Sequence, residues 1–451
     1  MRLRIVLTVL CLVLIAGAGW PQRVRAQDQL SFIRDAEIES IIRTWWTPIL
    51  GAAGLDPQAV HIYLVNDPRL NSFVAGGQNL FINTGTLIRS ASPNQIIGII
   101  AHETGHIAGG HLARSEQAMH NATIAGIIAM AAGAAAAAAS HSPDAGAAAV
   151  LGGAGVSERS FLNFSVAQEA SADHAALTFL DRTHQSARGL LEFFQILEQE
   201  ELLSGEREDP YLRTHPLTRD RVTYVRDHVD HSPWSGAPDP PAWIAMHQRM
   251  KAKLDAFLNP PAQILAKYKA DDTSVPARYA RAIAYYRIPE LKQALALIDG
   301  LIAQAPNDPY FHELKGQMLF ENGRVKEALA PYQRAVELKP DNALLKIELS
   351  QVELESSDPA LVPKAMTLLN NASAFEGENG DLWRLLAIAY GRSGNMGMMA
   401  LSLAEQGMAN GNYNEARQQA ARAIKMLPPG AQRQRAQDIA DDARRERARQ
   451  D

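Results

Sequence analysis

The sequence predicts a mainly α-helical protein in two parts: a domain with a small β-sheet built around a metal-binding helix, followed by an α-solenoid of paired helices. Two observations lead to this fold class. A pair of histidines with an adjacent glutamate lies in an apolar, helix-like run at residues 102–106, and Pro306 and Pro340, 34 residues apart, punctuate the second half of the chain. A length of 451 residues suits two or three domains.

The first 26 residues have the pattern of a secretory signal peptide. Met1 to Arg4 are positive, Ile5 to Gly19 are almost wholly apolar, and a short stretch ending in Ala26 supplies a cleavage site, so we expect export and cleavage after Ala26. The single cysteine, Cys11, lies inside the apolar stretch and would be removed with it. The mature chain would then have no thiol and no disulfide.

The charge of the chain argues against a nucleic-acid-binding protein. The formal net charge is -5, and the first 26 residues hold four arginines and no acidic residue, so the mature chain carries about -9. A phosphate backbone repels a protein of this charge.

Residues 102–106, His-Glu-Thr-Gly-His, are the first candidate metal-binding residues. The apolar run Ile96 to Ile100 leads into them, which indicates a buried helix and argues against a chance match. On a helix, His102 and His106 share one face and can bind zinc, while Glu103 can act as a general base toward a water molecule there. Zinc lowers the pKa of a bound water to about 7, which suits hydrolysis.

Another histidine follows closely. His111 lies nine residues beyond His102 and would sit on the opposite side of a continuous helix, so we assign it to packing or capping.

Glu169 and Asp173 form the second candidate cluster. They lie one helical turn apart, so Glu169 can supply a third metal ligand and Asp173 can accept the N–H of a ligand histidine. The alternative is an exposed acidic helix, but the alanines around both carboxylates favour close packing. His174 points about 100° away from this face, and we expect it to be structural.

A segment rich in alanine and glycine, residues 121–156, separates the two clusters. Its first part, Asn121 to Ser140, has no charged residue and is long enough to span a bilayer in principle. Alanine and glycine drive insertion weakly, so we expect a lid beside the site that packs on the protein or makes a peripheral membrane contact.

The second half of the chain has an internal repeat. A spacing of 34 residues is the period of the tetratricopeptide helix pair. One unit fits this repeat best. Its residues match the repeat's positions for small residues, for the turn, for a large residue and for the proline that ends the helix pair: Gly316, Gly323, Ala328, Tyr332, Ala335 and Pro340. About four such units would stack into an arc with a groove for extended segments or partner proteins, the alternative being a plain helical bundle.

These observations set the expected domain boundaries. We place the first domain at residues 27–258, a linker at 259–273, the repeats at 274–430 and a polar tail, able to form a capping helix, at 431–451. One repeat unit is expected to be irregular, because Pro359 to Glu378 breaks the period.

The order of the two metal-binding motifs resembles the gluzincin peptidases that include HtpX and the CAAX-prenyl proteases. The stretch from Asn71 to Gly85 resembles their edge strand, and Thr214-His215-Pro216-Leu217 followed by Arg221 resembles their Thr-His-Pro segment. The resemblance implies one zinc ion per chain, held by His102, His106 and Glu169, with Glu103 as the catalytic base.

With the leader and the repeats, the chain resembles the family of periplasmic beta-barrel assembly-enhancing proteases of Gram-negative bacteria. This resemblance covers most of the mature chain, including Phe32 to Glu37. It implies a periplasmic zinc endopeptidase that degrades misfolded or stalled outer-membrane β-barrel proteins and promotes their assembly. The implied partners are these unfolded or stalled barrels, the barrel assembly machinery and the lipopolysaccharide-transport barrel.

The resemblance also implies a gate. His215 would cover the zinc, and Pro216 after it would hold the loop, so that the imidazole displaces the catalytic water. Held slightly off the metal, His215 could instead donate to an oxyanion, and an ordinary loop histidine is the third alternative. Arg221 is expected to pair with a carboxylate near the site.

Substrate binding is expected at a strand. We predict that Asn79, Leu80, Phe81, Ile82 and Asn83 form an edge strand that pairs with an extended substrate backbone above the zinc.

Three function classes follow from these residues. The first is a zinc endopeptidase that is also an assembly factor. The second is a mainly non-proteolytic periplasmic chaperone or adaptor that acts through the repeat groove. A structural zinc site is the third, and three protein ligands with a nearby acid disfavour it, since structural sites are closed and usually rich in thiolates.

Overall fold

The computed structural model describes residues 31–111, 114, 165–204 and 215–450. These residues are mainly helical and include one four-stranded sheet, so the predicted fold class is confirmed. The expected signal peptide with Cys11, the segment 121–156 and Thr214 lie outside the described residues. Within the described residues, no helix has both the length and the apolar character needed to cross a membrane.

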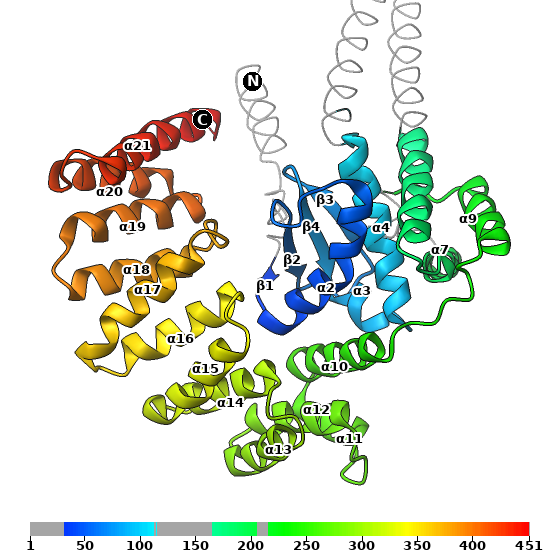
Figure 1. Cartoon of the computed structure of the whole chain (residues 1–451), viewed down its shortest axis with the longest axis horizontal. Coiled ribbons are helices and arrows are strands. Elements are labelled where there is room, and N and C mark those ends of the chain that lie inside the picture. The colour runs from blue at the N-terminus through cyan, green and yellow to red at the C-terminus, as the bar shows by residue number, and fades with distance from the viewer. Residues whose placement is uncertain (1–30, 112–113, 115–164, 205–214, 451) are drawn as a thin grey trace, which may run out of the picture.

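The N-terminal domain packs one sheet against several helices (Figure 1). Its strands are β1 (Phe32–Ile33), β2 (His61–Val65), β3 (Ser72–Ala75) and β4 (Asn79–Asn83). Its helices are α2 (Ala36–Ala53), α3 (Thr84–Arg89), α4 (Pro93–Gly109), α7 (Arg188–Ser204) and α9 (Arg219–His231). Another helix covers residues 165–182.

The sheet has the strand order β1-β2-β4-β3, so the expectation that Asn79–Asn83 is an edge strand is wrong. β4 is parallel to β2 and antiparallel to β3, and its Leu80 lies opposite Ile62 on one side and Val74 on the other. Among the described strands the edges of the sheet are β1 and β3, and β4 is interior. The reason is the turn between β3 and β4, where Gly76 and Gly77 have φ of 56° and 96° and close a tight hairpin.

Helix α4 carries the first metal-binding motif and is buried along most of its length. The Ser92 side chain accepts a hydrogen bond from the Gln95 N–H, which caps the start of the helix, and Gly110 ends it in the left-handed conformation at φ 61°. Gly98 allows α7 to approach closely, because a Cβ there would lie 2.7 Å from the Leu190 nitrogen.

Helix α2 supports α4 from the other side of the core. Trp45 and Trp46 are both fully buried, and the Trp46 indole N–H donates to Thr104 Oγ1 at 2.8 Å. Thr104 is the middle residue of the 102–106 motif, so this hydrogen bond holds the motif itself against α2.

The second half of the chain is a series of helix pairs that curve around the N-terminal domain (Figure 1). The pairs are α12 (Val275–Tyr286) with α13 (Leu291–Gln304), α14 (Pro309–Glu321) with α15 (Val325–Leu338), α16 (Ala343–Glu355) with α17 (Val362–Ala372), α18 (Gly380–Arg392) with α19 (Met396–Ala409), and α20 (Tyr413–Met426) with α21 (Ala431–Gln450). A short 3-10 helix, Pro359–Leu361, precedes α17.

The predicted repeat residues have the expected contacts. Gly316 of α14 faces the ring of Tyr332 on α15, where a Cβ would lie 2.6 Å from the ring, and Gly323 makes the turn between them at φ 75°. The expected polar tail is the helix α21, which buries Ala436, Ile439 and Ala443 against the preceding pair.

The two halves meet at α10 (Pro241–Leu258). Met250 and Leu254 of α10 belong to the core of the N-terminal domain, whereas Ala252 and Ala256 belong to the core of the first repeats. The segment expected to be a linker holds a helix, α11 (Pro261–Lys267), because a proline at the first position starts a helix rather than breaking one.

Candidate metal centre

Helix α4 places three motif residues at the centre of the N-terminal domain. His102 and Glu103 are fully buried and His106 is 7% exposed, so the motif faces the interior as predicted. The two imidazoles meet through their Nε2 atoms, which lie 3.2 Å apart.

The helix at residues 165–182 brings Glu169 against this pair. Gly105 of α4 makes the approach possible, because a Cβ there would lie 2.6 Å from the Ala172 carbonyl oxygen. The Glu169 carboxylate oxygens lie 3.2 Å from His102 Nε2 and 3.3 Å from His106 Nε2.

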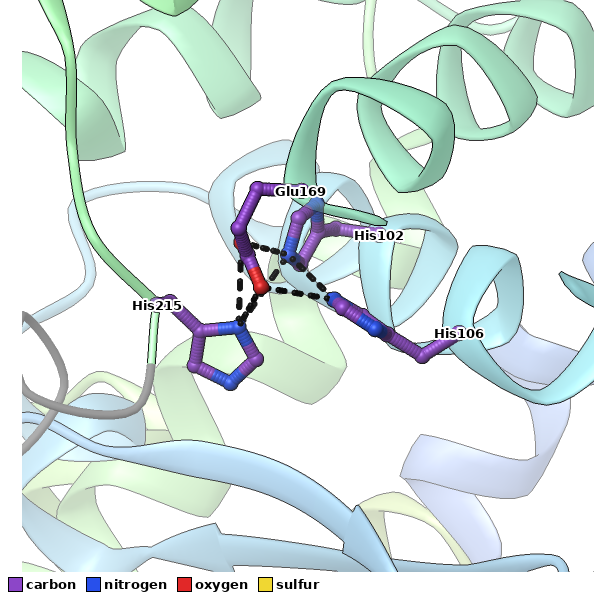
Figure 2. Close-up of side chains that lie close together, drawn as sticks. All are labelled: His102, His106, Glu169 and His215. Carbon is purple, nitrogen blue, oxygen red and sulfur yellow. Dashed lines mark hydrogen bonds and ion pairs between the residues drawn. The ribbon is translucent and has the colours of Figure 1, made fainter. Parts of the chain in front are cut away.

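His215 completes a four-membered cluster, shown in Figure 2. Its Nδ1 lies 3.1 Å from Glu169 Oε1 and 3.4 Å from His102 Nε2. His102, His106, Glu169 and His215 are all buried, and one possible ligand atom from each lies within 4.8 Å of the others.

These separations fit a metal ion held by four ligands. In a tetrahedron with metal–ligand bonds of about 2.0–2.1 Å, the ligand atoms are about 3.3 Å apart. With Glu169 Oε1 as its ligand atom, four of the six edges of this cluster measure 3.1–3.4 Å. Three imidazoles and one carboxylate are also ligand types that zinc accepts in proteins.

Asp173 and Arg221 orient the candidate ligands through hydrogen bonds and ion pairs outside the cluster. His102 Nδ1 donates to Asp173 Oδ1 at 2.9 Å, the contact expected from the sequence, and this leaves the Nε2 lone pair facing the cluster. Arg221 donates to both oxygens of Asp173, at 2.6 and 2.9 Å, and lies 2.9 Å from Glu169 Oε2. The carboxylates that Arg221 pairs with, which could not be chosen from the sequence, are therefore Asp173 and Glu169.

His111 has a role that the sequence did not reveal. Its Nδ1 lies 3.0 Å from Nδ1 of His106, on the side of the ring away from the cluster. Helix α4 ends at Gly109 and Gly110 takes the left-handed conformation, so the argument from a continuous helix does not apply. Gly109 and Gly110 were the available signal, since Gly109 leaves space for the His111 ring and Gly110 ends the helix.

Glu103 lies close to the cluster without belonging to it. Both of its carboxylate oxygens are buried without a hydrogen-bond partner, and Oε1 lies 3.7 Å from His215 Nε2. Burial raises the pKa of Glu103, so this carboxylate is able to accept and hold a proton.

The electrostatics of the ligands differ from one residue to the next. Burial lowers the pKa of His106 to about 3, which keeps its lone pair available. Burial also opposes charge on His102, but Asp173 and Glu169 together raise the pKa of His102 to about 10. The carboxylates thus make the centre attractive to positive charge.

His174 and the predicted substrate-binding strand Asn79–Asn83 are not part of the four-residue cluster. His174 contacts Tyr224, with 2.6 Å between His174 Nδ1 and the hydroxyl, and takes no part in the cluster. β4 lies inside the sheet, whereas the edge strand β3 contacts α4.

Comparison with known proteins identifies this domain. Residues 33–229 match peptidase family M48, and residues 277–343 match a tetratricopeptide repeat family. The N-terminal domain is a metallopeptidase domain that matches family M48. The prediction of a metallopeptidase followed by tetratricopeptide repeats is confirmed.

Two curated relatives align with most of the chain. The chain is 23% identical over 421 residues to the beta-barrel assembly-enhancing protease of Yersinia pestis, covering 89% of this chain and 81% of that one. It is 23% identical over 338 residues to the protein of the same name in Escherichia coli (strain K12), covering 73% and 67%.

Two further likenesses concern parts of the chain. A match to the metalloprotease LoiP of Escherichia coli (strain K12) has 26% identity over 175 residues and covers 38% of this chain and 63% of that one. A solved structure of the tetratricopeptide repeat protein YrrB is 17% identical, with a TM-score of 0.32, and covers 38% of this chain and 89% of that one.

Proposed function

We propose that the protein is a periplasmic zinc endopeptidase and assembly factor that cleaves outer-membrane β-barrel proteins when they are misfolded or stalled, and promotes their assembly. The observation that carries the proposal is the buried cluster of His102, His106 and Glu169 beside the Glu103 carboxylate, whose two oxygens have no hydrogen-bond partner. The name of the relatives supports the substrate class and the periplasmic location.

His102, His106 and Glu169 are the zinc ligands in this proposal. Zinc, when bound, polarises the scissile carbonyl and lowers the pKa of water so that it becomes a nucleophile near neutral pH. Asp173 and Arg221 orient His102 and Glu169, which keeps the ligand atoms in place through the reaction.

Glu103 is the general base. Its carboxylate accepts a proton from the attacking water and passes it to the amine that leaves when the peptide bond breaks. Its burial supports this role, because a raised pKa lets the group hold the proton between the two steps.

His215 is the gate. Its Nδ1 lies 3.1 Å from Glu169 Oε1 and 3.4 Å from His102 Nε2, so it would fill the fourth ligand position that a water or a substrate carbonyl would otherwise take. Cleavage therefore requires His215 to move away, and from a displaced position its ring can donate to the oxyanion that forms on the substrate.

Substrate backbone pairs with β3 in this proposal. β3 (Ser72–Ala75) is the edge strand that contacts α4, and an extended chain adds to such an edge through main-chain hydrogen bonds. Recognition of backbone suits a peptidase that acts on unfolded barrel strands of many sequences.

A second function, non-proteolytic assistance to assembly through the repeat groove, is favoured by the position of His215. A centre whose fourth corner is filled by a side chain does not cleave, so the repeats can act on partners such as the barrel assembly machinery and the lipopolysaccharide-transport barrel while the peptidase is closed.

The test compares the mature chain with Glu103→Gln and His215→Ala, measuring bound zinc and cleavage of casein. We expect Glu103→Gln to keep zinc and lose at least about 100-fold in rate, and His215→Ala to keep zinc and cleave faster. His231→Ala, on the exposed end of α9, is the matched control. Cleavage by Glu103→Gln at the wild-type rate would refute the peptidase mechanism, and zinc without cleavage in every variant would favour the second function.

A further inference from the structure

A cavity of about 470 Å³ lies between the M48 domain and the first repeats, away from the metal centre. Its walls come from the start of α2, the end of α10, and the helices α14, α15 and α16, so both halves of the protein contribute. The apolar part of the wall consists of Ile33, Ile38, Leu254, Phe257, Leu258 and Phe320.

The two cations on the α10 side of this junction are already engaged. Lys253 Nζ lies 2.8 Å from Asp35 Oδ2 and 3.2 Å from Glu37 Oε2. Arg249 forms ion pairs with Glu37 and Asp308. The two positive charges are thus already offset by the three carboxylates of Asp35, Glu37 and Asp308, and neither remains to balance a further acidic group in the cavity.

Glu313 of α14 and Glu348 of α16 are the acidic groups that are not balanced. Glu313 is 6% exposed and its Oε2 has no hydrogen-bond partner. Its ion pair with Lys253 Nζ is long, at 3.6 Å, and the same ammonium lies closer to Asp35 and Glu37. Glu348 Oε2 is buried and also lacks a hydrogen-bond partner. Both carboxylates line the cavity.

The remaining charged groups in the wall have partners elsewhere. Glu321 accepts a hydrogen bond from Gln317 Nε2 at 2.9 Å and another from the Tyr286 hydroxyl. Arg34 donates to Glu39 and Glu376, each through two hydrogen bonds. The unmet requirement of the cavity is therefore positive charge at Glu313 and Glu348.

We propose that this cavity binds the lysine or arginine side chain of an extended polypeptide that lies between the M48 domain and the repeats. Long basic side chains have an apolar stem and a charged head, which match the apolar wall and the two unbalanced carboxylates. The site is independent of the metal centre and of whether the protein cleaves what it binds.

A calcium or magnesium ion fits the same cavity less well. Such ions need six or more oxygen ligands, whereas much of this wall is apolar and the Lys253 ammonium already faces Glu313. Burial also raises the pKa of both carboxylates, that of Glu313 to about 7, so the arriving cation favours their charged forms.

The test measures binding, by fluorescence anisotropy, of a labelled extended peptide to the full mature chain carrying Glu103→Gln, so that no cleavage interferes. Two probes are compared that differ only at one central position, lysine in one and the uncharged norleucine in the other. We expect the lysine peptide to bind at least about fivefold more tightly. Equal affinities of the two peptides would overturn the proposal, whatever the variants of the protein show.

Variants then locate the site. Glu348→Gln and Glu313→Gln, which keep the side-chain shape, should each remove most of the difference between the two peptides. Glu337→Gln, on the exposed face of α15, should keep it. A difference that persists in Glu348→Gln and Glu313→Gln, or displacement of the lysine peptide by magnesium at constant ionic strength, would overturn the assignment.

Discussion

Nδ1 of His106 lies 3.0 Å from Nδ1 of His111, on the side of the His106 ring opposite the metal-binding nitrogen. When Nε2 of His106 binds a metal, the ring proton stays on Nδ1, which donates a hydrogen bond to Nδ1 of His111. His111 therefore selects the tautomer and the ring orientation of His106, as carboxylates and carbonyls do for metal-binding histidines in other proteins.

This contact predicts that His111→Ala weakens metal binding about 10-fold, because His106 loses the acceptor that orients it. Competition with a chelator measures the affinity. His111→Gln, which restores an acceptor, should recover part of it, and His174→Ala serves as a control outside the centre. Unchanged affinity in His111→Ala would show that packing alone holds His106.

Gly105→Ala should weaken both folding and metal binding. The new Cβ would lie 2.6 Å from the Ala172 carbonyl oxygen and would push the helix at residues 165–182, with Glu169, away from α4. We expect a loss of about 1–3 kcal/mol in unfolding free energy, measured by denaturant titration, and weaker zinc retention.

Gly51→Ala is the matched control for that substitution. Gly51 lies in α2 with open space where its Cβ would be, so alanine should be neutral or stabilise by about 0.5–1 kcal/mol. Similar losses in the two variants would refute the close contact between Gly105 and Ala172.

Asp173→Asn should reduce metal retention by about 10- to 100-fold, since the new amide cannot accept from His102 and from both donors of Arg221 at once. Metal content after dialysis against a chelator is the measurement. Asp227→Asn, on the exposed part of α9, should retain metal like the wild type.

Glu353→Gln should stabilise the protein in a pH-dependent manner. Burial raises the pKa of Glu353 from 4.5 to about 7, so the folded state resists ionisation that the unfolded state allows. The folded wild type therefore loses stability as pH rises from about 4.5 and through 7, whereas glutamine does not ionise.

Thermal unfolding at two pH values checks this. The melting temperature of Glu353→Gln should exceed that of the wild type at pH 8, corresponding to about 1–3 kcal/mol, and match it near pH 4. The exposed Glu355→Gln on the same helix should show no such dependence. A stabilisation that is equal at both pH values would point to packing instead of charge.

Much of the metal centre could be predicted because it lies on helices. Helical periodicity places His102 beside His106 and Glu169 one turn before Asp173, and the small residues at Gly105 and Ala172 indicate that the two helices touch. The partners of Arg221 could not be predicted, since they depend on how α9 packs against the helix at residues 165–182.

The sheet and the ends of helices were harder to predict. Alternating residues identify Asn79–Asn83 as a strand, but no local pattern states which strands lie beside it, and β4 proved to be interior. The position of His111 depends on the left-handed residue Gly110 that ends α4, and helix α11 begins at a proline inside the segment predicted to be a linker.

Helix α10 has a consequence for any attempt to separate peptidase from repeats. Met250 and Leu254 fill one core while Ala252 and Ala256 fill the other, so successive turns of a single helix belong to different domains. A fragment that ends before Pro241 loses part of the peptidase core, and one that begins after Leu258 exposes the first repeat. Fragments intended to fold independently must therefore overlap, each retaining its own copy of residues 241–258.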